Sequence, residues 1–345
     1  MKFTNLSLRK LIREARRLFQ KKKNRPSFTY NKIRREPTEF QPDPLLVCPW
    51  TGAIHDQLDL AGLPGLKPRH RAAFNIASKY IDFRDKTILE VGGSTLPRDL
   101  LFDVLGVRKW IHIDFFGWQW QANRKNILTD SGKIVYPLNH PDSKKIISDN
   151  NHVVFDGSAS EIGEELYDEF DACISIAAFE HIIELRKTVT GIYRALKNDG
   201  VFFTLFGPLW SCKYGHHLDI NKEYCFKRIQ EIHLPPYAHL LYSASEIDEL
   251  LSPYYKQPEE ILIKNQIVKG CTDESSSNHL FYEDFIEIMQ SSLFENISFA
   301  PELQSVVDSG DWFRLCRRYP KYRSFSVISM QIAAKKQKRL NPVPG

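Results

Sequence analysis

The 345-residue sequence lacks an apolar run long enough to cross a membrane. A spanning helix needs about 20 apolar residues, and the best apolar run is only Ala172–Phe179. Hydrophobic residues make up 42% and charged residues 26%, which is ordinary for a soluble globular protein and excludes a disordered chain, a collagen and a coiled-coil rod. The length predicts one large domain, or one domain with appendages.

Cysteines are few and scattered. The six cysteines form no C-x-x-C pair, which argues against a zinc site and against the disulfide framework of a small secreted chain. Cys173 falls inside a strand-like apolar run, so we expect a buried, reduced thiol there. These features favour a reducing, cytoplasmic location.

Acidic residues are almost missing from the first 35 positions. This arm holds 13 Lys or Arg and one acid, Glu14, so it carries +12, and the remaining 34 basic and 41 acidic residues carry −7. A nucleic-acid-binding domain is more often basic over its folded face. The acidic body therefore argues against nucleic acid as a partner.

The arm has the pattern of an amphipathic helix over residues 5–25, because its apolar residues recur at helical spacing between arginines and lysines. Three interpretations stay open: packing on the body or on a second subunit, peripheral contact with the inner face of an anionic membrane, and targeting or RNA binding. Residues 26–66 are rich in proline and predict a linker or strap.

The body alternates predicted strands and helices, which indicates an α/β fold with a doubly wound, mostly parallel sheet. We expect this core over residues 67–244, with an insertion at about 116–152, and C-terminal helices and closing strands over 245–345. Asn198-Asp199-Gly200 is expected to end the longest core helix. The predicted strands cover 87–91, 110–115, 153–155, 170–176, 201–206, 294–299 and 323–334. The predicted helices cover 67–81, 96–105, the segment from His181 to Leu196, 245–251 and 281–293.

Polar residues follow the predicted strands where a ligand is expected. Glu90, Gly92, Asp114 and Asp156 lie at or just past strand ends, and ligands of doubly wound sheets bind outside the carboxyl ends of the strands. From Gly92 the chain reads G-G-S-T-L-P, which lacks the G-x-G-x-x-G fingerprint for a pyrophosphate. A nucleoside without phosphates fits this turn better.

Two blocks carry a family resemblance. Ile88–Ser94 resembles the first motif of class I S-adenosylmethionine-dependent methyltransferases, E/D-x-G-x-G-x-G, although Ser94 and Leu96 stand where the family often has glycine. Phe170–Leu196, with its FDACISIAAFEHI and RALKNDGVFF segments, resembles a later part of the same domain. The FGPLWSCKYGHHL segment resembles one in methyltransferases of bacterial surface-sugar and natural-product clusters.

The resemblance implies S-adenosylmethionine as the cofactor and gives roles to individual positions. The methionine part would meet Glu90, Gly92 and Gly93. Asp114 would hold the ribose hydroxyls, which suits a carboxylate because it accepts two hydrogen bonds. The remaining implied contacts are Asp156, Gly157 and Ser158 at the adenine and Ala177 and Ala178 at the floor of the site.

Histidines and aromatic residues near the strand ends are the candidates for chemistry. A methyl transfer to oxygen benefits from a base, and His181, His216 and His217 are the candidate bases. Trp210 and Tyr214 are candidates to stack on a sugar or another flat acceptor. Paired histidines without a third spaced ligand are weak evidence for a metal, and we expect none.

We expect O-methylation of a small molecule or glycan, and the basic arm would suit a lipid-linked glycan. The N-methyltransferase tetrapeptide (N/D)-P-P-Y fails, since Leu234 precedes Pro235-Pro236-Tyr237. Two alternatives stay open. One is a catalytically inactive binding or scaffold protein with the same fold, and the other is an RNA methyltransferase that uses the basic arm.

Overall fold

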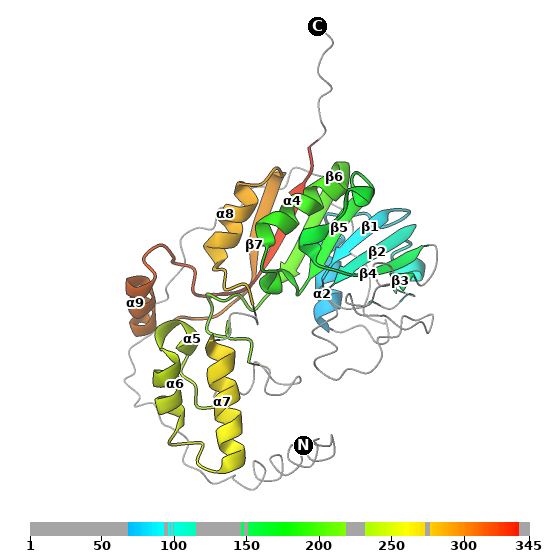
Figure 1. Ribbon diagram of the computed structural model, residues 1–345. Coiled ribbons are helices and arrows are strands. Elements are labelled where there is room, and N and C mark those ends of the chain that lie inside the picture. Colours follow the sequence, from blue (N-terminus) through cyan, green and yellow to red (C-terminus); the bar gives the residue numbers. More distant parts are fainter. Residues whose placement is uncertain are drawn as a thin grey trace.

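A computed structural model describes residues 68–114, apart from 93–95, 97 and 99, and then residues 146–147, 151–218, 232–272 and 277–337 (Figure 1). The predicted basic helix at 5–25, the strap at 26–66 and most of the insertion at 116–152 lie outside the described residues. Within the described residues no helix has both the length and the apolar character to cross a membrane.

An eight-stranded sheet forms the centre of the fold, in the order β3-β4-β2-β1-β5-β6-β8-β7. The pairs β1–β2, β1–β5, β2–β4 and β5–β6 are parallel, whereas β3–β4, β6–β8 and β7–β8 are antiparallel. The predicted doubly wound, mostly parallel sheet is confirmed. The strands are β1 (Thr87–Val91), β2 (Lys109–Asp114), β3 (Ile146–Ile147), β4 (His152–Asp156), β5 (Phe170–Ile176), β6 (Leu196–Phe206), β7 (Glu295–Gln304) and β8 (Val327–Lys335).

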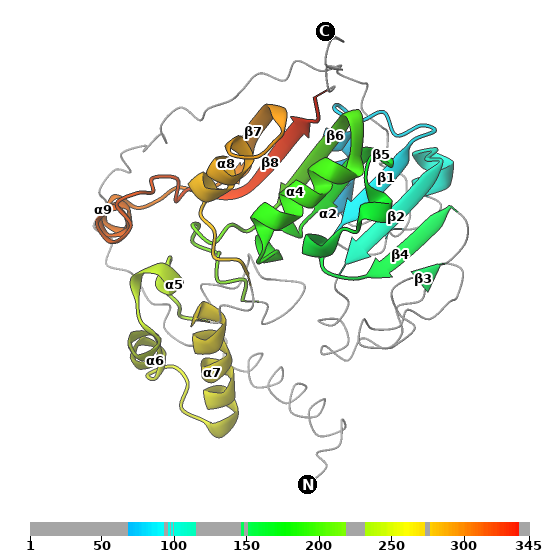
Figure 2. The ribbon, with the colours of Figure 1, turned by 45° about the horizontal axis from the view of Figure 1, so that its top comes forward.

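Helices cover both faces of the sheet (Figure 2). Strand residues alternate between the faces, so Leu89 and Val91 belong to one apolar core and Ile88 belongs to the other. The first core includes residues of α4 (Leu185–Ala195) and α8 (Tyr282–Gln290), and the second includes residues of α2 (Pro68–Ala77). Cys173 is a free, buried thiol in the first core, as the apolar run predicts.

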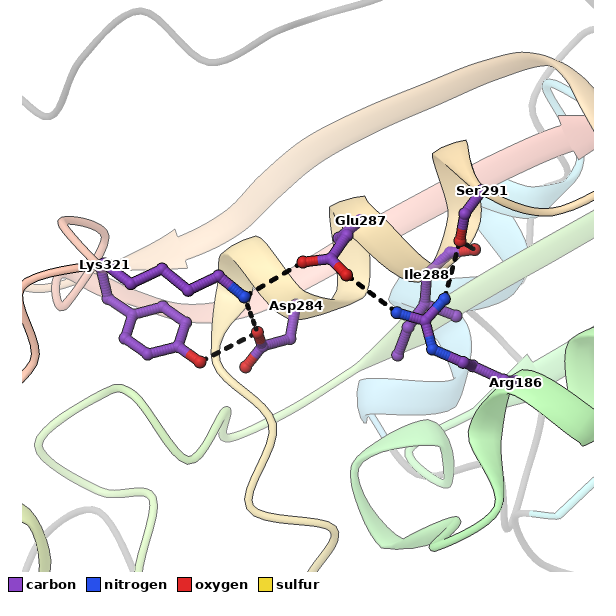
Figure 3. A network of polar contacts seen from close by, with 7 residues as sticks. Arg186, Asp284, Glu287, Ile288, Ser291 and Lys321 are labelled. Atoms are coloured by element: carbon purple, nitrogen blue, oxygen red, sulfur yellow. Dashed lines mark hydrogen bonds and ion pairs between the residues drawn. The ribbon is translucent and has the colours of Figure 1, made fainter.

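Polar contacts join α8 to its neighbours at the surface (Figure 3). Arg186 of α4 donates to Glu287 of α8 at 3.0 Å and to Ser291, just after α8, at 2.8 Å. Lys321, in the segment before β8, reaches Asp284 at 3.3 Å and Glu287 at 3.1 Å. These contacts tie α8 both to α4 and to the chain that leads into the last strand.

A helical cap lies off the edge of the sheet at which the parallel strands end (Figures 1 and 2). It contains α5 (Ala238–Leu241), α6 (Ala244–Leu251) and α7 (Pro258–Thr272), while α9 (Ser309–Arg318) lies between β7 and β8 in the chain. The cap has an apolar core of its own, built around Ala238, Ile247 and Ile267. The expected C-terminal helical additions are therefore present, although α5, α7 and α9 were not predicted.

One local prediction was wrong. Helix α4 ends at Ala195, because Leu196 already pairs with Phe170 as part of β6. Gly200 lies in a bulge of β6, where Asp199 takes the left-handed φ of 64° and a Cβ on Gly200 would meet the carbonyl of Lys197 at 2.8 Å. The helix expected at 96–105 is present in the described residues, where Arg98 is helical and Leu100–Val104 form a π-helical turn.

Candidate functional site

The turn after β1 lies against the turn after β5. Gly92 has a φ of +66°, and a Cβ at this position would overlap the Cβ of Ala178. Ala177 also takes a left-handed φ, 51°, and its N–H donates to the Leu205 carbonyl at 2.8 Å. Small residues and unusual backbone angles therefore bring two strand exits together, and only glycine fits at position 92 without displacing a neighbour.

The ends of β2 and β4 lie beside this contact. Asp114 pairs in register with Asp156, and the Gly157 N–H donates to the Asp114 carbonyl at 2.9 Å. The Asp114 side chain is 12% exposed. Ser158 caps the turn that follows, since its hydroxyl accepts from the Ser160 N–H at 3.3 Å. The side chain of Asp156 lies outside the description, and so does Gly93.

Three buried side chains connect the β1 and β2 ends beneath the surface. Trp110 donates to Glu90 at 2.9 Å, and the two nitrogens of His112 lie 3.7 Å from Glu90 and 3.9 Å from Asp114. Burial raises the pKa of Glu90 well above its usual range, and burial together with nearby His152 lowers the pKa of His112 to about 3. The imidazole of His112 is therefore neutral at neutral pH, and burial favours the protonated form of Glu90.

We call Glu90, Gly92, Asp114, Asp156–Ser158 and Ala177–Ala178 the cofactor corner. The structure brings these predicted residues together at neighbouring strand ends. The corner fits S-adenosylmethionine in two respects. The close approach at Gly92 puts backbone, not a side chain, at the end of β1. The Asp114 carboxylate lies at the end of β2, which is where folds of this kind hold the ribose of a nucleotide.

The turn after β5 continues directly from the cofactor corner to a buried carboxylate. The Glu180 side chain is only 3% exposed and accepts from the Gly207 N–H at 3.2 Å, which joins the exits of β5 and β6. Its Oε1 atom lies 4.0 Å from Nε2 of His181, whose side chain is 47% exposed. Asn278 closes the turn from the other side by donating to the carbonyls of Phe179 and Ile182 at 2.7 and 3.1 Å.

His217 lies edge-on to His181, with ring centroids 4.9 Å apart. Its Nε2 is 2.7 Å from the Pro208 carbonyl, to which it donates. Burial, followed by the nearby His181, lowers the pKa of His217 to about 3. A base with so low a pKa is weak at neutral pH, whereas His181 is exposed and lies beside a carboxylate. The geometry favours His181 of these two.

His216 and Trp210 lie deeper. His216 is 3% exposed, and its Nδ1 accepts from the Leu218 N–H at 3.2 Å. Burial lowers its pKa well below the usual value. Trp210 is buried in a small apolar core, with one ring face stacked on His279 at 3.6 Å and its ring centroid 4.6 Å from that of His239. The predicted stacking of an acceptor on Trp210 stays a prediction.

Tyr214 lies in the same loop with Lys213 over its ring at 5.0 Å. No group of three or more potential ligands able to hold a metal ion occurs in the part of the chain that the structure describes. Asp219, which follows the paired histidines, lies outside that part.

Two histidines of this region were not identified from the sequence. His239 lies in α5 and His279 precedes α8, and each contacts Trp210. Neither stands beside a strand end in the sequence, so strand-end reasoning alone has no signal for them. Together these five residues form what we call the histidine cluster: His181, His216, His217, His239 and His279.

Residues 140–204 match the family model described as a methyltransferase domain. The matched segment contains β4, β5, α4 and most of β6, which includes the second of the two blocks that carry the resemblance. The match supports S-adenosylmethionine as the cofactor. Among curated proteins no relative matches the chain.

Solved structures give a distant likeness. A Listeria monocytogenes protein assigned as an S-adenosylmethionine-dependent methyltransferase is 15% identical, with 75% of this chain and 93% of that chain covered and a TM-score of 0.39. The YcgJ protein of Bacillus subtilis is 12% identical, with 78% and 100% covered and a TM-score of 0.41. An S-adenosylmethionine-dependent methyltransferase of Mesorhizobium loti is 10% identical, with 74% and 93% covered and a TM-score of 0.39. Likeness at this level says nothing about the acceptor.

Proposed function

We propose that this chain is an S-adenosylmethionine-dependent methyltransferase that methylates a hydroxyl oxygen of a small molecule or glycan. One observation carries the proposal. The cofactor corner and the histidine cluster share one turn, in which Ala178 lies against Gly92 and the Ala178 carbonyl accepts from the His181 N–H at 2.9 Å. A residue able to take a proton thus directly follows the floor of the cofactor site.

The bound cofactor would supply an electrophilic methyl group on a sulfonium sulfur. When the methyl group moves to the acceptor oxygen, the S–C bond breaks as the O–C bond forms, the sulfur keeps the electron pair, and the hydroxyl proton leaves to a base. We assign that proton to His181. The Glu180 carboxylate at 4.0 Å favours the imidazolium that would result, and the Gly207 N–H holds this carboxylate in place.

The remaining residues of the site would orient the cofactor and enclose the reacting groups. Asp114 is assigned to the ribose hydroxyls, and Gly92 and Ala178 to the wall against which the cofactor would lie. The cap lies over this edge of the sheet (Figure 1), where it would keep water from the reacting groups. Contact between the arm at 5–25 and an anionic membrane stays a proposal, and it would suit a lipid-linked glycan as the acceptor.

Calorimetric titration with S-adenosylhomocysteine tests the proposal, with Asp114→Ala beside the unchanged protein. We expect micromolar binding and a loss of about tenfold or more in the variant, because a carboxylate accepting from two hydroxyls contributes at least that much. Asp199→Ala is the matched control, because Asp199 forms a surface ion pair with Lys335 at 3.0 Å and is not part of the cofactor corner. Well-folded protein that fails to bind would overturn the proposed function.

A further inference from the structure

Among the described residues, one ring nitrogen of His239 makes a hydrogen bond and the other makes none. The residue is 8% exposed, and its Nε2 lies 2.8 Å from the Trp210 carbonyl. Its Nδ1 is buried and makes no hydrogen bond with any described residue. Buried polar atoms in native proteins nearly always have a partner, so this nitrogen points to a group beyond the residues that the structure describes.

The hydrogen bond at Nε2 fixes which proton His239 carries. A backbone carbonyl only accepts, so Nε2 must hold the proton and Nδ1 must present a lone pair. Burial also lowers the pKa of His239 to about 4, which keeps the imidazole neutral near pH 7. The missing partner is therefore a hydrogen-bond donor.

The rings around His239 are polar and carry no negative charge. Among the described residues, Trp210 and His216 contact the His239 ring, and His279 lies on Trp210, near enough to affect the pKa of His239. Burial, together with neighbouring His239, lowers the pKa of His216, so it is neutral as well. Ser211 and Ser277, which adjoin this group in the chain, have buried hydroxyls that make no hydrogen bond with the described residues.

The place of His239 connects it to the proposed reaction. Trp210 follows β6 by four residues, and His217 of the same loop touches His181. His239 itself begins the cap that lies off the ends of the strands (Figure 2). A molecule held between cap and sheet would thus meet His239 and His181 at the same edge.

We propose that Nδ1 of His239 accepts a hydrogen bond from an uncharged hydroxyl of the acceptor, and so holds the acceptor at the edge of the sheet. This inference rests on the proposed function and adds the chemistry of the acceptor. An ionised phosphate or carboxylate has no proton to donate to Nδ1. An ammonium group would need a negative partner, and the rings that face His239 carry none.

Two substitutions separate the nitrogens of His239. His239→Gln keeps an N–H near the position of Nε2, and with it the bond to the Trp210 carbonyl, but removes the acceptor at Nδ1. His239→Asn keeps an amide oxygen near the position of Nδ1 and loses the bond to Trp210. The probes are methyl α-D-glucopyranoside, methyl α-L-rhamnopyranoside and catechol, each titrated into full-length protein saturated with S-adenosylhomocysteine.

We expect His239→Gln to weaken binding of the best probe at least tenfold, and His239→Asn to keep it within about threefold. Affinity for S-adenosylhomocysteine should stay unchanged in both variants. If His239→Gln and the unchanged protein bound the best probe equally well, the inference would be overturned. If the unchanged protein did not bind S-adenosylhomocysteine at all, the proposed function would be overturned instead.

Nitrogen-15 NMR of the unchanged, histidine-labelled protein gives a second readout that needs no variant to fold. The Nδ1 signal of His239 should show an unprotonated nitrogen that shifts when a hydroxylic probe binds. Sulfate and methylammonium, which have no hydroxyl group, serve as charged controls and should leave it in place. A protonated Nδ1, a shift with sulfate or methylammonium, or no shift with any hydroxylic probe would each contradict the inference.

Discussion

The cofactor corner and the histidine cluster lie at the same edge of the sheet but are built in different ways. The corner is made by backbone: neighbouring strands end in register, and Gly92 and Ala177 supply the unusual angles of the turns. The cluster is made by side chains from four segments that are far apart in the sequence, at residues 181, 216–217, 239 and 279.

Because of this difference, substitutions are tolerated less well in the cofactor corner than in the histidine cluster. Backbone turns at strand ends tolerate little change, because a Cβ at position 92 would overlap Ala178. Imidazoles in the cluster are held by carbonyls, those of Pro208 and Trp210, and such bonds leave the other ring nitrogen open to a ligand. The cofactor corner is therefore suited to binding one cofactor, and the histidine cluster is suited to recognising the acceptor.

The largest expected effect is on turnover through His181. His181→Gln should lower kcat about 100-fold with the best acceptor, since a positioned base contributes at least that factor. The dissociation constant of S-adenosylhomocysteine should not change. Labelled methyl transfer measures the rate. If His217→Gln removed the activity and His181→Gln did not, the base would be His217.

Gly92→Ala should weaken S-adenosylhomocysteine binding about tenfold to 100-fold, because the methyl group must push the two turns apart. Gly106→Ala is the matched control. Its φ of +64° is as unusual, but its Cβ would find only Arg84 at 3.7 Å. We expect that control to lose about 1 kcal/mol of stability and none of its affinity, and calorimetry with thermal melting checks both. Equal affinity losses would mean that backbone strain, not the Ala178 contact, matters.

Acidification should destabilise the fold, with the cluster contributing more than the corner. His216, His217 and His239 in the cluster, and His112 beneath the corner, have pKa values lowered by burial. Below about pH 6.5 the unfolded chain binds protons on these imidazoles, whereas in the folded chain His112, His217 and His239 bind them only near pH 3 to 4. The free energy of unfolding therefore falls across this range. Its full value is present above pH 6.5.

The lowered pKa of His239 alone reduces the free energy of unfolding at pH 5 by about 2 kcal/mol. Urea unfolding at pH 7 and pH 5 measures it, and His239→Gln should reduce the difference between the two by that amount. An unchanged difference in the variant would show that His239 titrates normally in the folded protein.

The smallest effect is expected outside both regions. Lys321→Ala removes the contacts to Asp284 and Glu287 (Figure 3), but these groups are exposed, and surface ion pairs contribute little. The melting temperature should change by about 1 °C or less, and binding of S-adenosylhomocysteine should not change. A loss of affinity would mean that α8 transmits strain to the cofactor corner.

Much of the fold and of the corner could be predicted from sequence, because both depend on local patterns. Short apolar runs followed by Glu90-Val91-Gly92 or Asp114 indicate strands and their ends, and parallel pairing then brings those ends together. The wrong assignment of Gly200 has a local cause as well. The glycine follows a helix by only five residues, and pairing of Leu196 with Phe170 ended that helix earlier.

The cluster could be predicted only in part. His181, His216 and His217 follow strands and were identified from the sequence. The contact of His216 with His239, and the turn that Asn278 closes around His181, depend on segments that are distant in the sequence. Helix α7 could not be predicted from its apolar pattern, because only three of its 15 residues are buried, namely Lys264, Ile267 and Cys271. Tertiary contacts, which no window of sequence contains, decide these features.

The order of strands in the sheet has a consequence for synthesis of the chain. Strand β8 is the last in sequence, yet it lies between β6 and β7, so β6 has no neighbour on that side until Lys335 has been made. Until then β6 presents an open strand edge rich in Phe202, Phe203 and Phe206, which is the kind of surface that pairs with other chains. A ribosome-bound chain halted before β8 should therefore depend on chaperones, whereas the completed chain closes its own edge.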